Sequence, residues 1–249
     1  MPNLVIDIGN TFVKISVFEA NKLVYNQKTN ELTTEFIIKL IEKHQTKNLI
    51  VSSVKKELGF NEDEIKKKVN YILFNGETLI PIKNKYETPK SLGLDRLAGV
   101  IGANFLYPNQ NILVIDAGTC ITYDTLNNNA EYFGGSISPG LNMRFNAMHH
   151  FTSKLPLVNF EGSFKKSFGG NTEDAMSSGV INGTFYEAEG FIKQYLIAKP
   201  DAKIILCGGD SAFFDSKFKN SIFAHLILHE PNLVLIGLNT VVNYQHDLK

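Results

Sequence analysis

The same acidic turn occurs twice in this chain, as DIGNT at residues 7–11 and as DAGT at residues 116–119. Each copy follows an apolar segment, residues 4–6 and 112–115, that we expect to be a buried strand. Glycine lets the backbone approach phosphate oxygens, and backbone N–H groups and the threonine hydroxyl can donate hydrogen bonds to them. The aspartate can hold Mg²⁺ directly or through its water shell. Two such turns facing each other predict a site that binds a triphosphate.

A single copy of this turn would be weak evidence, because Asp-Gly pairs are also common in plain hairpins. The presence of two copies, each after a predicted buried strand and each in its own half of the chain, favours a functional role over a chance occurrence. The sequence contains no GxxxxGK[ST] and no GxGxxG after a strand. It therefore indicates neither a Walker-type loop nor a dinucleotide-binding fold.

A third candidate element, GLDR at residues 93–96, lies between the two turns. Apolar residues then recur at helical spacing as far as Phe105, so Asp95 falls in the first turn of a predicted helix, where the helix dipole favours a negative charge. A carboxylate held there can accept the proton of a substrate hydroxyl during phosphoryl transfer. Arg96 beside it can bind a carboxylate or phosphate through two hydrogen bonds. The alternative is an ordinary acidic helix start followed by an exposed arginine.

The elements that would position these residues are strands and helices in two similar sets. The acidic turns each lie between two predicted strands, which indicates an internal repeat and two α/β lobes, residues 1–110 and 111–249. Near Thr172, a good N-cap residue, a long helix is predicted whose glycines, Gly179, Gly183 and Gly190, indicate close packing against another backbone. The predicted strands are residues 4–6, 13–17, 23–25, 49–54, 112–115, 121–125, 132–137 and 203–207; further helices are predicted around residues 36–41 and at 237–244, after an apolar segment at 233–236.

Composition narrows the class of protein. The 249 residues have a formal net charge of zero, whereas a protein that grips nucleic acid through phosphates usually carries a basic excess. No apolar run reaches the roughly 20 residues of a membrane-spanning helix, and the first residues lack a signal-peptide pattern. Cys120 and Cys207 lie far apart in apolar or glycine-rich segments, which predicts two reduced thiols. We therefore expect a cytoplasmic protein with no nucleic-acid or membrane partner.

The ordered set of motifs resembles the type III pantothenate kinase family of the actin-like, ribonuclease-H-like kinases. It consists of DIGNT, GLDR, DAGTC, GGSISPG at residues 134–140 and GGNT at residues 169–172, and it covers nearly the whole chain. One departure is Leu94, where the family usually has proline. The resemblance implies two ribonuclease-H-like lobes with the nucleotide in the cleft between them. It also implies ATP-dependent phosphorylation of pantothenate to 4′-phosphopantothenate, the first step of coenzyme A synthesis.

The resemblance also implies roles for individual residues. Asp95 would accept the proton of the pantothenate hydroxyl, Asp116 would bind a monovalent cation, K⁺ or NH₄⁺, and Thr119 would be a second ATP contact beside Mg²⁺-bound phosphates. Thr172 would reach the substrate from the interface of a homodimer. The expected ATP-binding segment consists of Asp7, Ile8, Gly9, Asn10, Thr11, Phe12, Val13 and Lys14, and the expected pantothenate pocket of Tyr86, Gly93, Leu94, Asp95, Arg96 and Thr172.

Several alternatives stay open at this stage. The protein could be another small-molecule kinase of the same superfamily, acting on a sugar or a carboxylate, or a regulatory ATP-binding protein that affects transcription. Gly208-Gly209-Asp210 is either a turn for adenosine or an ordinary strand-to-helix turn. The GGSISPG run is expected to be a tight, close-packed turn, and the neighbouring pair His149-His150 is not expected to bind a metal.

Overall fold

The computed structural model of the protein describes residues 1–160, 162 and 164–248, and the chain forms two compact units. Unit 1 contains Met1–Pro108, Ala130–Phe133 and Leu233–Lys249, and unit 2 contains Asn109–Asn129 and Gly134–Asn232. The predicted lobes, residues 1–110 and 111–249, remain a prediction. The compact units differ from those lobes chiefly because the last segment of the chain belongs to unit 1.

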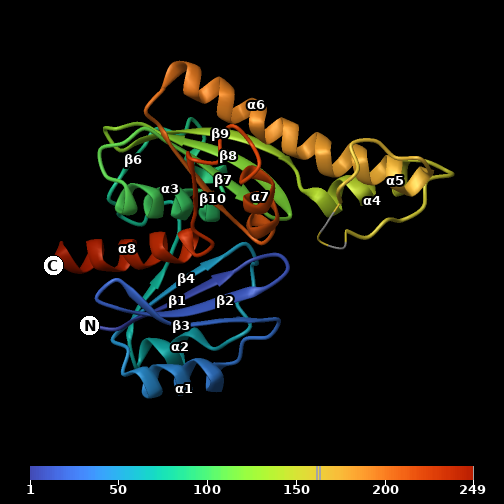
Figure 1. Cartoon of the computed structure of the whole chain (residues 1–249). Coiled ribbons are helices and arrows are strands. Elements are labelled where there is room, and N and C mark those ends of the chain that lie inside the picture. Colours follow the sequence, from blue (N-terminus) through green and yellow to red (C-terminus); the bar gives the residue numbers. More distant parts are fainter. Residues whose placement is uncertain (161, 163, 249) are drawn as a thin grey trace. The chain divides into compact units, whose positions relative to one another are not determined.

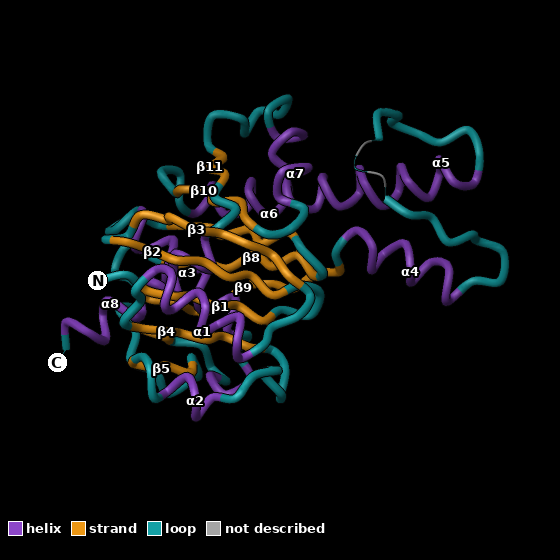
Figure 2. Tube along the Cα trace, turned by 90° about the horizontal axis from the view of Figure 1, so that it is seen from below, coloured by secondary structure: helices purple, strands orange, loops and turns teal. Residues whose placement is uncertain are grey.

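Unit 1 is built on a five-stranded sheet (Figure 1). Its order is β3 (Lys22–Thr29), β2 (Val13–Glu19), β1 (Asn3–Ile8), β4 (Asn48–Ser53) and β5 (Asn70–Leu73), with β1 antiparallel to β2 and parallel to β4. Every residue of β1 is buried, as expected of a central strand covered on both faces. Figures 1 and 2 show α1 (Thr34–His44) and α2 (Glu62–Lys66) on one face and α8 (Leu233–Asp247) on the other.

Two helices of unit 1, α3 (Leu94–Leu106) and α8, approach each other through glycines. A Cβ at Gly102 would lie 2.4 Å from the Leu233 carbonyl oxygen, and one at Gly237 would lie 1.8 Å from the Ala98 carbonyl oxygen. Both glycines are therefore needed for this contact. The segment at residues 233–236 is the first turn of α8, so the predicted C-terminal helix begins four residues earlier than expected.

The short elements β6 (Lys83–Asn84) and η1 (Pro89–Ser91) precede α3 in unit 1. Strand β6 is parallel to the start of β9 (Glu131–Pro139), where Asn84 lies opposite Tyr132.

Unit 2 has a sheet of the order β11 (Ile227–His229), β10 (Lys203–Cys207), β7 (Ile112–Ala117), β8 (Cys120–Leu126) and β9. Strand β7 is parallel to β10 and antiparallel to β8, as β1 is to β4 and β2 in unit 1. This shared pattern accounts for the two copies of the acidic turn. The helices of the unit are α4 (Leu141–Phe151), α5 (Thr172–Ser177), α6 (Gly183–Ala198) and α7 (Ser211–Phe218), and the π-helical segment Ser178–Asn182 joins α5 to α6.

The strand predicted at residues 132–137 is confirmed as part of β9, which continues to Pro139, so the GGSISPG run is not the tight turn that was also predicted. Gly140 is the N-cap of α4, a helix that the sequence did not predict. The close packing is confirmed: a Cβ at Gly135 would lie 1.8 Å from the Tyr123 carbonyl oxygen, and one at Gly140 would lie 2.2 Å from that of Gly118. The absence of a side chain at Gly135 and Gly140 therefore lets backbone segments of unit 2 pack directly against each other.

The start of the α5 helix differs from the prediction by one residue. Asn171 is the N-cap, because its side-chain oxygen accepts a hydrogen bond of 2.8 Å from the Asp174 N–H, and Thr172 is the first helical residue. The close packing predicted for Gly179, Gly183 and Gly190 is wrong, since a Cβ at each would meet nothing within 4 Å outside its own helix.

Two predictions from composition hold for the part of the chain that the structure describes. Cys120 and Cys207 form no disulfide. Among the helices of residues 1–160 and 164–248, none combines the length and the apolar character needed to cross a membrane.

Candidate functional site

The acidic turn of unit 1 connects β1 to β2. Asp7 lies opposite Lys14 in the register of these strands, and the Gly9 N–H donates a hydrogen bond of 3.1 Å to the Phe12 carbonyl oxygen. A Cβ at Gly9 would lie 3.2 Å from the same oxygen, so a larger residue would crowd the turn. Residues 10–12 are exposed, whereas the Asp7 side chain is 8% exposed. The turn thus exposes its backbone above a buried carboxylate.

The charge of Asp7 is linked to Asp95. Burial raises the pKa of Asp7 to about 6; the positive charge of Lys14 opposes this rise in pKa, and the negative charge of Asp95 adds to it. Asp7 and Asp95 belong to the same unit but to different elements, β1 and α3. The charge of the predicted proton acceptor therefore acts on the aspartate of the first predicted ATP turn.

Asp95 lies at the start of α3, as predicted. Gly93 is the N-cap, Leu94 the first helical residue, and the Asp95 Oδ1 atom accepts a hydrogen bond of 2.8 Å from the Arg96 N–H. A Cβ at Gly93 would lie 2.6 Å from that Oδ1 atom, so glycine leaves room for the carboxylate in this rotamer. Asp95 is exposed.

Arg96 is buried, which contradicts the alternative of an exposed arginine after an acidic helix start. Its side chain is 7% exposed, and the guanidinium carbon lies 5.6 Å from the centre of the Tyr86 ring. Tyr86 and Tyr132 are stacked, with ring centres 6.1 Å apart and an interplanar angle of 10°. Tyr132 is fully buried and supports the ring of Tyr86, one of the residues predicted to bind pantothenate.

Sequence reasoning missed Tyr132 because its relation to Tyr86 depends on strand pairing. The Lys85 N–H donates to the Tyr132 carbonyl oxygen at 2.8 Å, and Asn84 accepts a hydrogen bond of 3.0 Å from the Tyr86 N–H. The first bond holds the segment before α3 against the start of β9, and the second fixes the turn within that segment. An aromatic residue in a predicted strand was the only sequence signal.

The acidic turn of unit 2 is enclosed by backbone. The Gly118 N–H donates to the Cys120 carbonyl oxygen at 2.9 Å, and the Gly140 N–H donates to the Thr119 carbonyl oxygen at 3.1 Å. Asp116, at the end of β7, lies opposite Cys207 of β10 in the parallel register. The turn that follows β10 therefore reaches the end of β7.

Gly208 begins this neighbouring turn and has a positive φ of 100°. A Cβ at Gly208 would lie 2.3 Å from the Ala117 carbonyl oxygen and 2.4 Å from the Asp116 Oδ1 atom. The Asp210 N–H donates to the same Ala117 oxygen at 2.8 Å. The GGD segment is thus a strand-to-helix turn that also packs on the second predicted phosphate turn.

Thr172 is the one predicted site residue that belongs to neither the Asp7–Asp95 cluster nor the Asp116 turn. It is exposed at the start of α5 in unit 2. Among the described residues, no group of three or more histidine, cysteine, aspartate and glutamate side chains is arranged to hold a metal ion, and His149 instead contacts the Leu155 carbonyl oxygen at 2.8 Å. Single carboxylates such as Asp7 nevertheless fit Mg²⁺, which takes most of its ligands from water and phosphate.

Comparison with solved structures confirms the predicted α/β fold class. A structure named as a Baf family transcriptional activator from Campylobacter jejuni has a TM-score of 0.63 and 21% identity and covers 98% of this chain and 99% of its own. Another, named as an N-acetylmannosamine kinase from Listeria monocytogenes, has a TM-score of 0.55 and 14% identity and covers both chains completely. At these identities the likeness concerns the fold.

Comparison of sequences identifies the family. The family described as type III pantothenate kinase matches residues 3–194. A type III pantothenate kinase from Phocaeicola vulgatus is 39% identical over 247 residues, which cover 99% of this chain and 100% of that protein. The chain therefore belongs to the type III pantothenate kinase family.

Proposed function

We propose that this protein transfers the γ-phosphoryl group of ATP to the primary hydroxyl of pantothenate, giving 4′-phosphopantothenate, the first intermediate of coenzyme A synthesis. The observation that carries the proposal is an exposed Asp95 at the start of α3 whose negative charge acts on the buried Asp7 of a phosphate-type turn. Membership of the family supports the choice of pantothenate as the acceptor.

Each residue of the first cluster has a role in this transfer. Backbone N–H groups and side chains of residues 7–14 bind the ATP phosphates, and Asp7 would hold Mg²⁺, which would supply positive charge to offset that of the phosphates. Asp95 accepts the proton of the hydroxyl as its oxygen attacks the γ-phosphorus and the bond to the β-phosphate oxygen breaks. The exposed position of Asp95 leaves its second carboxylate oxygen available for this step.

The pantothenate pocket consists of Tyr86 and residues 93–96, with Thr172 as a further contact. Arg96 is held over the Tyr86 ring, so its donors are oriented before the pantothenate carboxylate arrives. Leu94 takes the first helical position, where proline is favoured because its φ is already helical. Helix α3 begins there without proline, so we expect this departure from the family pattern to leave the pocket formed.

In unit 2, Asp116 is proposed to bind the monovalent cation, K⁺ or NH₄⁺, and Thr119 to contact ATP. Gly208 supports this role, because an added Cβ there would lie 2.3 Å from the Ala117 carbonyl oxygen and 2.4 Å from the Asp116 Oδ1 atom, so these two oxygens lie close together. Oxygen ligands from carbonyl and carboxylate groups suit such hard cations.

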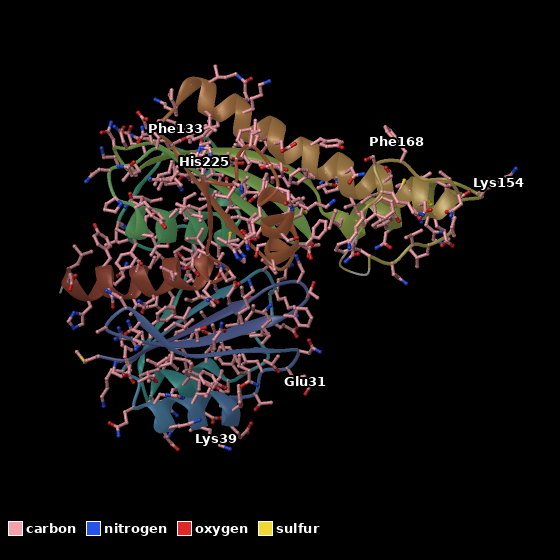
Figure 3. All side chains as sticks on the ribbon, in the orientation of Figure 1. Glu31, Lys39, Phe133, Lys154, Phe168 and His225 are labelled. Atoms are coloured by element: carbon pink, nitrogen blue, oxygen red, sulfur yellow. The ribbon has the colours of Figure 1, made fainter. Side chains whose placement is uncertain are left out.

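We also propose that the protein is a cytoplasmic homodimer in which unit 2 supplies the interface. Phe151 and Phe168 are 81% and 88% exposed, and Figure 3 shows Phe168 projecting from its loop. Exposed apolar side chains of this extent commonly mark protein interfaces. Cytoplasmic placement is supported by two cysteines without a disulfide.

Coupled measurement of ADP release tests the function. With purified protein and ATP, we expect ADP to form only when pantothenate is present, and faster in K⁺ than in Na⁺. ADP release that depends on a sugar or another carboxylate instead of pantothenate would show a different kinase. Salt-dependent DNA binding without pantothenate-dependent ADP release would indicate a regulatory protein.

A further inference from the structure

His229 is connected to the turn beside Asp116 by a chain of side-chain contacts in unit 2. The His229 Nε2 atom lies 2.9 Å from the Ser211 Oγ atom, and that Oγ atom lies 2.7 Å from the Gly208 carbonyl oxygen. His229 ends β11, which is parallel to β10, and Ser211 begins α7 directly after the turn. The imidazole therefore supports the turn from the neighbouring strand.

The donors in this chain can be assigned by counting protons. The Gly208 carbonyl oxygen can only accept, so the single Ser211 hydroxyl proton is donated to it. The Ser211 oxygen then accepts from His229, which places a proton on Nε2. The Asp215 Oδ2 atom lies 3.9 Å from Nδ1, on the other side of the ring, and is also 2.7 Å from the Lys219 Nζ atom.

This trio of serine, histidine and aspartate does not form a nucleophilic site. Ser211 is 2% exposed, and its hydroxyl proton is already donated to the backbone rather than to the imidazole. A hydrolytic serine needs the opposite direction, with the imidazole accepting the hydroxyl proton. The group therefore has a positioning role.

The role follows from what the turn touches. Gly208 packs on the Asp116 carboxylate and on the Ala117 carbonyl oxygen, with no room for a Cβ. A shift of the Gly208 carbonyl would therefore move the surroundings of Asp116. We propose that His229 is a positioning residue for nucleotide and monovalent-cation binding in unit 2, acting through Ser211 and the Gly208–Gly209 turn. This inference rests on the proposed kinase function.

Matched variants of His229 test the proposal. Alanine at this position leaves the buried Ser211 oxygen without its donor, so His229→Ala is expected to raise the KM for ATP about 3- to 10-fold, the usual worth of one hydrogen bond. The K⁺ concentration for half-maximal activity is expected to rise as well, while kcat and the KM for pantothenate stay within about 2-fold of the wild-type values.

Substitutions that restore or fail to restore the hydrogen bond to Ser211 separate a positioning role of His229 from a general effect on stability. The amide nitrogen of glutamine takes the place of Nε2 and can donate to Ser211, whereas that of asparagine takes the place of Nδ1 and falls short. We therefore expect His229→Gln to bind ATP like the wild type and His229→Asn to resemble His229→Ala. Isothermal calorimetry with an ATP analogue gives the same comparison without turnover. His225→Ala, at an exposed histidine of unit 2 labelled in Figure 3, is the control.

The outcomes distinguish failure of the proposed kinase function from failure of the proposed role of His229. A wild-type protein that neither binds ATP nor phosphorylates pantothenate would overturn both the proposed function and the role of His229. A wild-type protein that does both, with all three His229 variants equal to His225→Ala in ATP affinity, would overturn the role of His229 alone. Equal losses in His229→Gln and His229→Asn, or a loss confined to pantothenate, would also contradict it.

Discussion

The two acidic turns share a sequence pattern but have different surroundings. Asp7 in unit 1 is faced by charged side chains, Lys14 across the strand pair and Asp95 from α3. Asp116 in unit 2 is enclosed by backbone, because glycines at positions 118, 140 and 208 allow loops to close on the turn. The same strand–turn–strand motif thus depends on neighbouring charged side chains in unit 1 and on close backbone packing in unit 2.

This difference predicts which substitutions matter in each unit. Changes of charge that preserve volume are expected to affect unit 1 most, since its turn depends on electrostatic coupling. Addition of a methyl group is expected to affect unit 2 most, because the room for a Cβ is absent at several of its glycines.

The largest effect is expected from Asp95→Asn, which preserves shape and removes the proposed proton acceptor. We expect kcat to fall by about 10²- to 10⁴-fold, the usual contribution of a general acid–base group. Steady-state ADP release at saturating ATP and pantothenate measures this. Asp63→Asn is a matched control, because Asp63 also lies in the first turn of a helix of unit 1 and its side chain is 88% exposed. Turnover by Asp95→Asn within a few-fold of that control would remove the proposed role.

A smaller effect, on stability, is expected at Asp7. Its folded-state pKa is about 6, above the ordinary value of 3.8, so the folded state holds its proton more tightly than the unfolded state. Stability from this group is complete below about pH 4 and is lost as the pH rises through about 6. The loss amounts to on the order of 3 kcal/mol, from a pKa shift of roughly two units.

Asp7→Asn removes this dependence. Urea unfolding of the wild type and the variant at several pH values between 4 and 8 gives the difference in free energy of unfolding. We expect the variant to gain stability relative to the wild type as the pH rises through this range. A difference in free energy of unfolding that stays constant with pH would show that burial does not disfavour the Asp7 charge. It would also contradict the electrostatic difference between the two acidic turns.

Much of the fold could be predicted from sequence because its signals are local. Strand β10 has the predicted bounds, since an apolar run there ends at two glycines, and the helical spacing after residue 93 gave α3. The acidic turns were readable for the same reason. Asn171 and Thr172 are both good cap residues, so local chemistry alone left that helix start ambiguous by one residue.

The parts that could not be predicted depend on strand order and pairing. Gly135 falls within the predicted strand at residues 132–137, but its close approach to the backbone of β8 could not be predicted. Tyr132 supports Tyr86 only because β9 pairs with β6, and His229 reaches Ser211 only because β11 lies beside β10. Such contacts join residues far apart in sequence, and no local pattern encodes them.

The two glycines of the GGD turn, Gly208 and Gly209, test whether close backbone packing matters in unit 2. Gly208 has a positive φ and no room for a Cβ, whereas a Cβ at Gly209 would meet nothing within 4 Å. We therefore expect Gly208→Ala to lower the free energy of unfolding by about 1–3 kcal/mol, the usual cost of a strained backbone position, and to weaken ATP binding. Gly209→Ala is expected to change both quantities little. Thermal unfolding and ATP titration compare them, and equal behaviour of the two variants would contradict the packing argument.

The smallest effect is expected from Arg96→Lys, which keeps the charge and removes the planar group over Tyr86. Loss of this stacking is worth about 0.5–2 kcal/mol, so the KM for pantothenate should rise by roughly 2- to 30-fold while the KM for ATP stays unchanged. Lys66→Ala is the matched control, since Lys66 lies 5.3 Å from the Tyr71 ring in the same unit but on α2. A rise in the KM for ATP instead would place Arg96 with the phosphate turn, and both halves of the unit 1 site would then depend on one charge network.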